Sequence, residues 1–255
     1  MHMKKWSKNF NLNAGIVEPT VCAVIAAYNR PEALALCLEG FRRQSFLVER
    51  HQEFHLILAD DGSGPEVEEL FSRFADTVSF PATYLFQPGK DWGKLRMLNW
   101  SVIEARAERM IFVDADCVPH REFVAAHFEE LTPETVCCGR RVELNETATS
   151  TVNAEKVRNG IFESPGWLAG TILQKQTDFG GPHGFYLPRW MARFATCFTK
   201  NAQPALLGSN FSIYRKWLME VNGFDESFES RGLGEDTDLQ RRLILAEARF
   251  VWITN

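Results

Sequence analysis

The chain has 255 residues, of which 45% are hydrophobic and 24% charged, values that are ordinary for a globular protein. This length suits one large domain that carries an insertion. A net charge of -5, with no dense cluster of lysine and arginine, argues against a nucleic-acid-binding protein. No run approaches the roughly 18 apolar residues of a membrane span, and the cysteines form no C-x-x-C pair. We therefore expect a cytoplasmic protein with reduced thiols, and peripheral contact with the inner face of the membrane stays open.

Strands and helices are predicted to alternate through the first half of the chain. Short apolar runs predict strands at Val21 to Ala27, Phe54 to Ala59, Thr83 to Gln87 and Met110 to Val113. Apolar residues recur at helical spacing after Pro31, after Pro65 and from Lys94 to Ala107. This alternation predicts an α/β fold with a mostly parallel sheet that helices cover on both faces. The turns that follow the strands should then lie along one edge of the sheet.

Two carboxylates, Asp114 and Asp116, follow the fourth of these strands at its carboxyl end, where open α/β sheets bind their ligands. Burying two unpaired carboxylates so close together is costly, because like charges raise each other's pKa. A divalent cation removes this cost, and Mg²⁺ or Mn²⁺ prefers carboxylate and phosphate oxygens. The pattern therefore favours a metal site, and a solvated turn is the alternative.

The chain changes character after Pro119. We expect a helix from Phe123 to Leu131, a strand from Val136 to Val142, and then a loop-rich insertion from Asn145 to Gln203. The aromatic residues of this insertion suit sugar rings, or simply fill space under a long loop. A further helix is expected from Arg215 to Val221.

A second acidic cluster, Glu235-Asp236, opens the last predicted helix. Acidic residues at a helix start can simply cap it and interact favourably with its dipole. If Asp236 instead faces the crevice beside other acids, its pKa is raised, as a general base requires.

Five short motifs, in order and spacing, resemble the family 2 glycosyltransferases of GT-A fold: Ala26-Ala27-Tyr28-Asn29-Arg30, Asp60-Asp61-Gly62-Ser63, Gly93-Lys94 with Asn99, Asp114-Ala115-Asp116, and Gly234-Glu235-Asp236. The resemblance runs from about Val21 to the end and is weakest in the insertion. The run Gly208-Ser209-Asn210, followed by Gly223-Phe224-Asp225-Glu226, is similar to bacterial polysaccharide and chondroitin-polymerase-like members.

The resemblance implies a single GT-A domain over residues 1–255, with a Rossmann-like mixed sheet flanked by helices. Residues from about 20–142 would form a nucleotide-sugar-binding half, and residues from about 143–255 an acceptor-binding half.

The same resemblance implies roles for the residues that bind the donor. Tyr28 and the backbone around Ala26 would line the nucleobase pocket, and Arg30 belongs to the same donor-binding group. Asp60 or Asp61 would hydrogen-bond the base, usually uracil.

Residues nearer the transferred sugar follow from the resemblance as well. Lys94 would lie near the phosphates or the sugar of the donor, and Asp114 would face the ribose or the sugar. Asp116, together with Asp114, would hold Mn²⁺ or Mg²⁺. Asp236 would be the catalytic base, supported by Glu235.

One departure from the family concerns the metal. Members of this type often supply a further ligand, a histidine just beyond the last strand. The sequence reaches Thr254-Asn255 without one, so His183 is the substitute candidate, and whether the natural chain continues past Asn255 stays open.

The reaction implied by these motifs is a metal-dependent, inverting transfer of a sugar from a nucleotide-sugar donor, most often a UDP-sugar, to a hydroxyl of a glycan or glycolipid acceptor. A non-catalytic carbohydrate-binding or scaffolding domain is one alternative. A sugar nucleotidyltransferase is the other, although Ala26-Ala27-Tyr28-Asn29-Arg30 lacks the glycine-rich phosphate loop that such an enzyme usually carries. Donor sugar, linkage and oligomeric state are not readable from the sequence.

Overall fold

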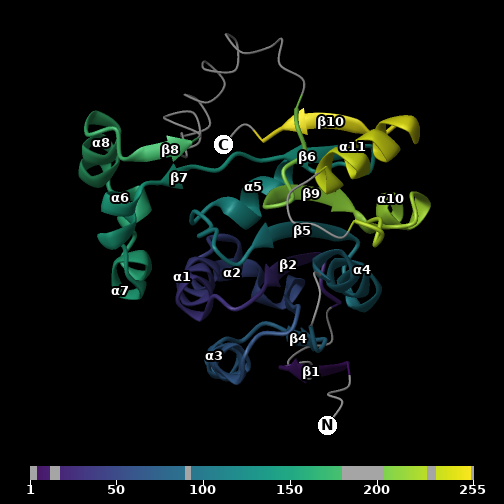
Figure 1. Cartoon of the computed structure of the whole chain (residues 1–255), viewed down its shortest axis with the longest axis horizontal. Coiled ribbons are helices and arrows are strands. Elements are labelled where there is room, and N and C mark those ends of the chain that lie inside the picture. Colours follow the sequence, from purple (N-terminus) through teal and green to yellow (C-terminus); the bar gives the residue numbers. More distant parts are fainter. Residues whose placement is uncertain (1–4, 12–17, 90–92, 180–203, 229–233, 254–255) are drawn as a thin grey trace.

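A computed structural model describes residues 5–11, 18–89, 93–179, 204–228 and 234–253. These residues include an eight-stranded sheet with the strand order β1-β4-β3-β2-β5-β9-β6-β10 (Figure 1). The strands, in chain order, are β1 (Trp6–Phe10), β2 (Val21–Ala27), β3 (Phe54–Asp60), β4 (Ala82–Phe86), β5 (Arg109–Asp114), β6 (Thr135–Cys138), β9 (Asn210–Tyr214) and β10 (Arg249–Trp252).

The four strands predicted from the first half of the chain, β2 to β5, are confirmed within two residues and run parallel to one another. Strand β2 lies between β3 and β5, so the chain winds outward from β2 in both directions. Every residue of β3 is buried, which explains why its sequence is a continuous apolar run rather than an alternating pattern. In such a sheet the crevice where the strand order reverses is the expected ligand site.

The sheet is mixed, as the resemblance implied, but two of its antiparallel strands were not predicted individually. Strand β1 extends the edge next to β4, where Trp6 packs its ring 5.2 Å from that of Tyr84. Strand β9 lies between β5 and β6 and is antiparallel to both. Its sequence includes Ser212, which is polar but fully buried. Because this residue interrupts the apolar run, the sequence pattern did not predict a strand here.

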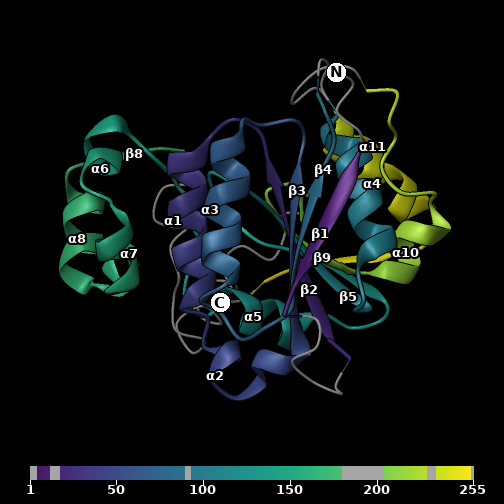
Figure 2. The same cartoon turned by 90° about the horizontal axis from the view of Figure 1, so that it is seen from below.

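Helices cover both faces of the sheet (Figure 2). Alternate residues of β2 pack on opposite sides, in keeping with the period of two of a strand. One face carries α1 (Pro31–Arg42), α3 (Pro65–Ala75) and α5 (Phe123–Glu130). The other carries α4 (Lys94–Glu104), α10 (Arg215–Glu220) and α11 (Glu235–Leu245). Within the described ranges, no helix combines the length and apolarity needed to cross a bilayer.

The prediction of a loop-rich segment from Asn145 to Gln203 is wrong for its described part, which ends at Phe179. This part holds short helices, namely α6 (Glu146–Ser150), α7 (Ala154–Arg158), η2 (Ile161–Glu163) and α8 (Pro165–Leu173). Strand β7 (Glu143–Leu144) pairs with β8 (Thr177–Phe179) beside them. Most of these helices are too short to show a 3.6-residue repeat, so the informative signal was the capping residues. Three of them cap α6, α7 and α8 by accepting a backbone hydrogen bond: Asn145, Asn153 and Ser164.

Several other predicted boundaries were too long. The helix that starts at Lys94 ends at Glu104, and the strand predicted from Val136 to Val142 ends at Cys138. His183 and the aromatic residues beyond Phe179 in the insertion lie outside the described residues.

Candidate active site

The carboxyl ends of β2, β3 and β5 meet at one edge of the sheet, as predicted. Ala26 is paired in register with Asp114, and the Ala115 backbone N–H donates to the Ala26 carbonyl at 2.9 Å. On the other side of β2, the Asp61 N–H donates to the Ala27 carbonyl at 3.0 Å. The turns that follow these strands are therefore held side by side by backbone hydrogen bonds.

Lys94 and Asp114 form an ion pair at this edge. The Lys94 Nζ donates to the Asp114 Oδ1 at 2.6 Å, and the two side chains are only 25% and 28% exposed. Burial alone would lower the pKa of Lys94, but attraction to Asp114, and more weakly to Asp236 and Glu235, outweighs burial and raises it. Lys94 is therefore a firmly charged cation, and acidic groups from the far end of the chain lie within its electrostatic reach.

Asp236 is brought to this edge by the first turn of α11. Its Oδ2 accepts a hydrogen bond of 2.8 Å from the Gly208 backbone N–H. Burial raises the pKa of Asp236 above its usual value, with Glu235 and Asp114 adding to the effect and Gly208 and Lys94 opposing it. The sequence predicted that acids from these distant motifs share one crevice, and in the structure Asp114 is close enough to Asp236 to help raise its pKa.

Asp116 lies at a more open position than Asp114. Its Oδ2 is 3.0 Å from the Arg30 Nη1, and the two side chains are 47% and 66% exposed. An ion pair this exposed contributes little stability and exchanges readily with other partners.

The donor atoms here fit a cation held jointly with phosphate oxygens rather than a cage made by protein alone. In the part of the chain that the structure describes, no cluster of three or more His, Cys, Asp or Glu side chains could hold a metal ion. Asp114 already pairs with Lys94, which leaves Asp116 as the more accessible carboxylate. Mg²⁺ characteristically binds through one or two carboxylates plus substrate phosphates, and this donor set matches that habit.

The carboxylates of Asp60 and Asp61 have protein partners. Asp60 is fully buried and accepts hydrogen bonds from the Ser63 N–H, from the Ser63 hydroxyl at 2.6 Å and from the Tyr84 hydroxyl at 2.5 Å. Burial raises its pKa, and these hydrogen bonds oppose the rise. Asp61 accepts from the Gln87 Nε2 at 2.6 Å and from the Gly93 N–H at 2.7 Å. Both residues thus shape the loops at the end of β3, and their contact with a base stays a prediction.

Two further motif residues differ in their surroundings: Tyr28 is exposed, and Asn99 is hydrogen-bonded within the protein. Tyr28 is 43% exposed at the end of β2, where a flat ligand could stack on it. Asn99, in contrast, binds both the N–H and the carbonyl of Phe224, at 2.8 Å each. Asn99 therefore fixes the turn that precedes α11 rather than facing a ligand.

Arg141 was not singled out from the sequence. Its Nη1 donates to the Ser209 Oγ at 2.7 Å, and its Nη2 lies 2.8 Å from the Glu143 Oε1. Its charge is also close enough to oppose the rise in the pKa of Cys117, the residue next to Asp116. The only sequence signal would have been its position just beyond a strand end, because its partner Ser209 is distant in the chain.

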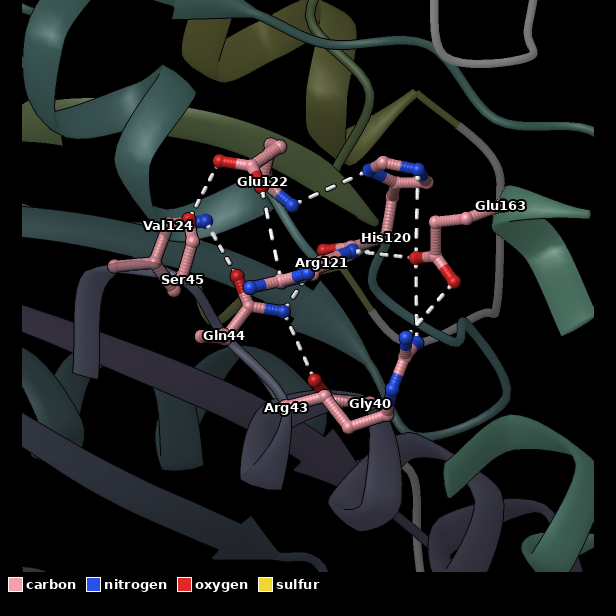
Figure 3. Close-up of polar contacts among 9 residues, drawn as sticks. All are labelled: Gly40, Arg43, Gln44, Ser45, His120, Arg121, Glu122, Val124 and Glu163. Carbon is pink, nitrogen blue, oxygen red and sulfur yellow. Dashed lines mark hydrogen bonds and ion pairs between the residues drawn. The ribbon is translucent and has the colours of Figure 1, made fainter. Parts of the chain in front are cut away.

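The insertion is tied to the loop that follows Asp116 (Figure 3). Arg43, at the end of α1, donates two hydrogen bonds to the Glu163 carboxylate, at 3.2 and 2.9 Å. The Arg121 backbone N–H donates to the same carboxylate at 3.1 Å, and the His120 Nε2 is 3.4 Å from it. Glu163 therefore links the insertion to α1 and to the loop that leaves the candidate site.

The sheet order, with helices on both faces, places the protein in the class of GT-A folds. S. aureus TarS in complex with UDP-GlcNAc superimposes with a TM-score of 0.60 at 15% identity, over 92% of this chain and 56% of that chain. A mannosyltransferase from Pyrobaculum calidifontis, in complex with GDP-Man and Mn²⁺, gives a TM-score of 0.57 at 14% identity, over 93% of this chain and 55% of that chain. At these identities, the similarity establishes the fold.

The family is established by sequence. Residues 22–195 match the model of glycosyl transferase family 2, and the chain belongs to this family. Residues 188–254 also match the model described as the N-terminal domain of galactosyltransferase.

Two curated relatives match along most of the chain. Chondroitin synthase of Escherichia coli is 24% identical over 86% of this chain, and the uncharacterized glycosyltransferase YfnE of Bacillus subtilis is 25% identical over 89%. The aligned region spans 31% and 61% of the length of these two relatives.

Proposed function

We propose that this protein transfers a sugar from a UDP-sugar to a hydroxyl of a glycan or glycolipid, with inversion at the anomeric carbon. The observation that carries the proposal is that Asp236 lies within electrostatic reach of the Lys94–Asp114 ion pair, at the carboxyl ends of the paired strands β2 and β5. The TarS complexes with UDP and UDP-GlcNAc and the relationship to a chondroitin synthase support this donor and acceptor class.

On the donor side, negative charge builds up on the departing diphosphate. Lys94 and Arg30 are cations at these strand ends, and each now neutralises a carboxylate that could turn to other partners. When bound by Asp116 and Asp114, Mn²⁺ or Mg²⁺ would supply Lewis-acid stabilisation of that negative charge. The two side-chain cations would orient the diphosphate so that it leaves away from Asp236.

On the acceptor side, Asp236 takes the proton of the attacking hydroxyl. The hydroxyl oxygen forms a bond to the anomeric carbon as the bond from that carbon to the diphosphate breaks, and the bonding electrons leave with the diphosphate. Because burial raises the pKa of Asp236, its carboxylate is a better proton acceptor than an exposed aspartate. Attack from the face opposite the leaving group inverts the anomeric centre, and Glu235 supports the base from the adjacent position.

Asp236→Asn is the direct test. The variant keeps the size of the side chain but cannot accept the proton, so transfer should fall by about 10²–10⁴-fold. Binding of the UDP-sugar, measured by calorimetry with Mn²⁺, should stay close to that of the wild type. Substantial turnover by Asp236→Asn would place the base elsewhere.

Asp116→Asn is the contrasting variant in the same assay. It should weaken the Mn²⁺-dependent part of donor binding, because the more accessible carboxylate is removed. If donor binding by this variant keeps its full dependence on Mn²⁺, Asp116 does not hold the cation.

A further inference from the structure

The backbone of the segment Gly208-Ser209-Asn210 lies directly against the carboxylate of Asp236, the candidate base. The Gly208 N–H donates to the Asp236 Oδ2 at 2.8 Å. A Cβ atom added to Gly208 would lie 2.5 Å from the Asp236 Oδ1 and 3.2 Å from its Cγ, well inside normal contact. A larger residue would therefore push the carboxylate away from the backbone amide, so Gly208 permits this close approach.

Hydrogen bonds made by Asn210 and the buried His127 hold the same segment in place. The Asn210 Oδ1 is 3.0 Å from the His127 Nε2, and the Asn210 Nδ2 donates to the Arg140 carbonyl at 2.6 Å. The other ring nitrogen of His127 lies 2.8 Å from the Ser212 Oγ. Burial lowers the pKa of His127 to about 3, so the ring is neutral and can serve as a fixed donor and acceptor.

The intervening residue also has a partner in the site. Ser209 is 2% exposed, and its hydroxyl accepts the hydrogen bond from Arg141. Three consecutive residues, Gly208, Ser209 and Asn210, thus contact the candidate base, Arg141 and the buried histidine of α5, respectively. Such a support holds the Gly208 amide in place before any ligand arrives, which is the requirement for a preorganised site.

We propose that Gly208 is a positioning residue for the transfer reaction: its backbone N–H sets the orientation of the Asp236 carboxylate toward the acceptor hydroxyl, with Asn210 and His127 holding the amide in place. This inference rests on the proposed function of Asp236 as the base. It gives a role to a motif that the sequence singled out without explaining.

Gly208→Ala tests the proposal. The added methyl should displace the carboxylate, and a displacement of about 1 Å costs on the order of 100-fold in rate. We expect kcat to fall by this factor while the dissociation constant of the UDP-sugar changes by less than about twofold, because only the acceptor side is altered. The matched control is Gly170→Ala in α8, where an added Cβ meets nothing within 4 Å. Unchanged kcat in Gly208→Ala, or an equal loss of donor binding, would overturn the proposal.

A double variant separates this inference from the proposed function. If Gly208 acts through Asp236, then Gly208→Ala should cause no further loss in the Asp236→Asn background. An inactive Asp236→Asn with a fully active Gly208→Ala would reject the positioning role alone. An active Asp236→Asn would reject the assignment of the base itself.

An amide signal of the wild-type fold gives a test that does not depend on how well Gly208→Ala folds. In nitrogen-15 NMR spectra, the Gly208 amide should move markedly between the wild type and Asp236→Asn, because the acceptor of its hydrogen bond loses its charge. An amide of α8, such as that of Gly170, should stay unchanged. A Gly208 signal that does not move would show that the hydrogen bond is absent in solution and would overturn the proposal.

Discussion

The sheet and the insertion are stabilised in different ways. All seven residues of β3 are buried, whereas α6, α7 and α8 each bury a single residue. The insertion lies beside α1 (Figures 1 and 2) and is joined to it by two bidentate ion pairs, Arg43–Glu163 and Arg158–Glu39. Apolar burial thus fixes the sheet, and directed polar contacts fix the insertion. The polar contacts of the insertion can therefore be altered without unfolding the sheet.

The largest expected effect comes from the sheet. Phe112 of β5 is 1% exposed, and its ring stacks on that of Phe211 with centroids 4.7 Å apart. Phe112→Ala removes this packing and leaves a cavity between β5 and β9, so we expect a loss of about 3–5 kcal/mol in the free energy of unfolding. Urea denaturation followed by circular dichroism measures this loss.

The matched substitution in the insertion is Phe162→Ala. Phe162 is only partly buried and packs edge-on against Trp167, with ring centroids 5.3 Å apart. Its removal should cost about 1 kcal/mol or less, because little buried area and a single aromatic contact are lost. Equal losses for the two phenylalanines would contradict the contrast between the regions.

A second effect depends on pH. Burial lowers the pKa of His55 to about 4 and that of His127 to about 3, so both are neutral in the folded protein at neutral pH. The unfolded chain binds these protons below about pH 6.5, so the stability that the neutral rings provide is lost as the pH falls from there toward 4 and 3. Each ring contributes up to about 1.4 kcal/mol per pH unit to this slope.

His127→Asn should lower the slope of the free energy of unfolding against pH by up to the contribution of one proton, about 1.4 kcal/mol per pH unit. Urea midpoints measured at several pH values between 7 and 4.5 would show this change. The Arg158–Glu39 pair should persist through this range. Burial opposes ionisation of Glu39, but Arg158 and Arg42 outweigh burial and lower its pKa below the usual 4.5. A wild-type stability that stays constant from pH 6.5 to 4.5 would contradict the assignment of two buried neutral histidines.

A further expected effect is confined to the insertion. Glu163→Gln removes the charge that Arg43 and the Arg121 N–H both bind, and we expect a cost of about 1–2 kcal/mol confined to the insertion. Hydrogen exchange should become faster in α6, α7 and α8, while β3 keeps its protection. The control is Glu69→Gln, whose partner Arg73 is 4.0 Å away on the exposed face of α3 and whose loss should be negligible. Uniformly faster exchange would indicate that the insertion and the sheet unfold as one unit.

The part of the fold that could be predicted is the part whose local pattern is strong. The parallel strands β2 to β5 are continuous apolar runs, and α1 and α3 each begin with a proline that marks the first helical turn. Strand β9 was missed because the buried Ser212 interrupts its apolar run. Helices α6 and α7 were missed because a helix of five residues is too short to show a 3.6-residue period.

The sequence by itself determined which side chains could form the site, because closely spaced acids at strand and helix ends are costly unless they bind something. It also determined that the ends of β2, β3 and β5 share one edge, since parallel strands joined by helices must end together. Only the tertiary structure decided the partners: Lys94 with Asp114, Arg30 with Asp116, and Gly208 with Asp236. These pairs join residues far apart in the chain, so their distances depend on how distant elements pack together, as α4 packs beside β5 and α11 beside the segment that leads into β9.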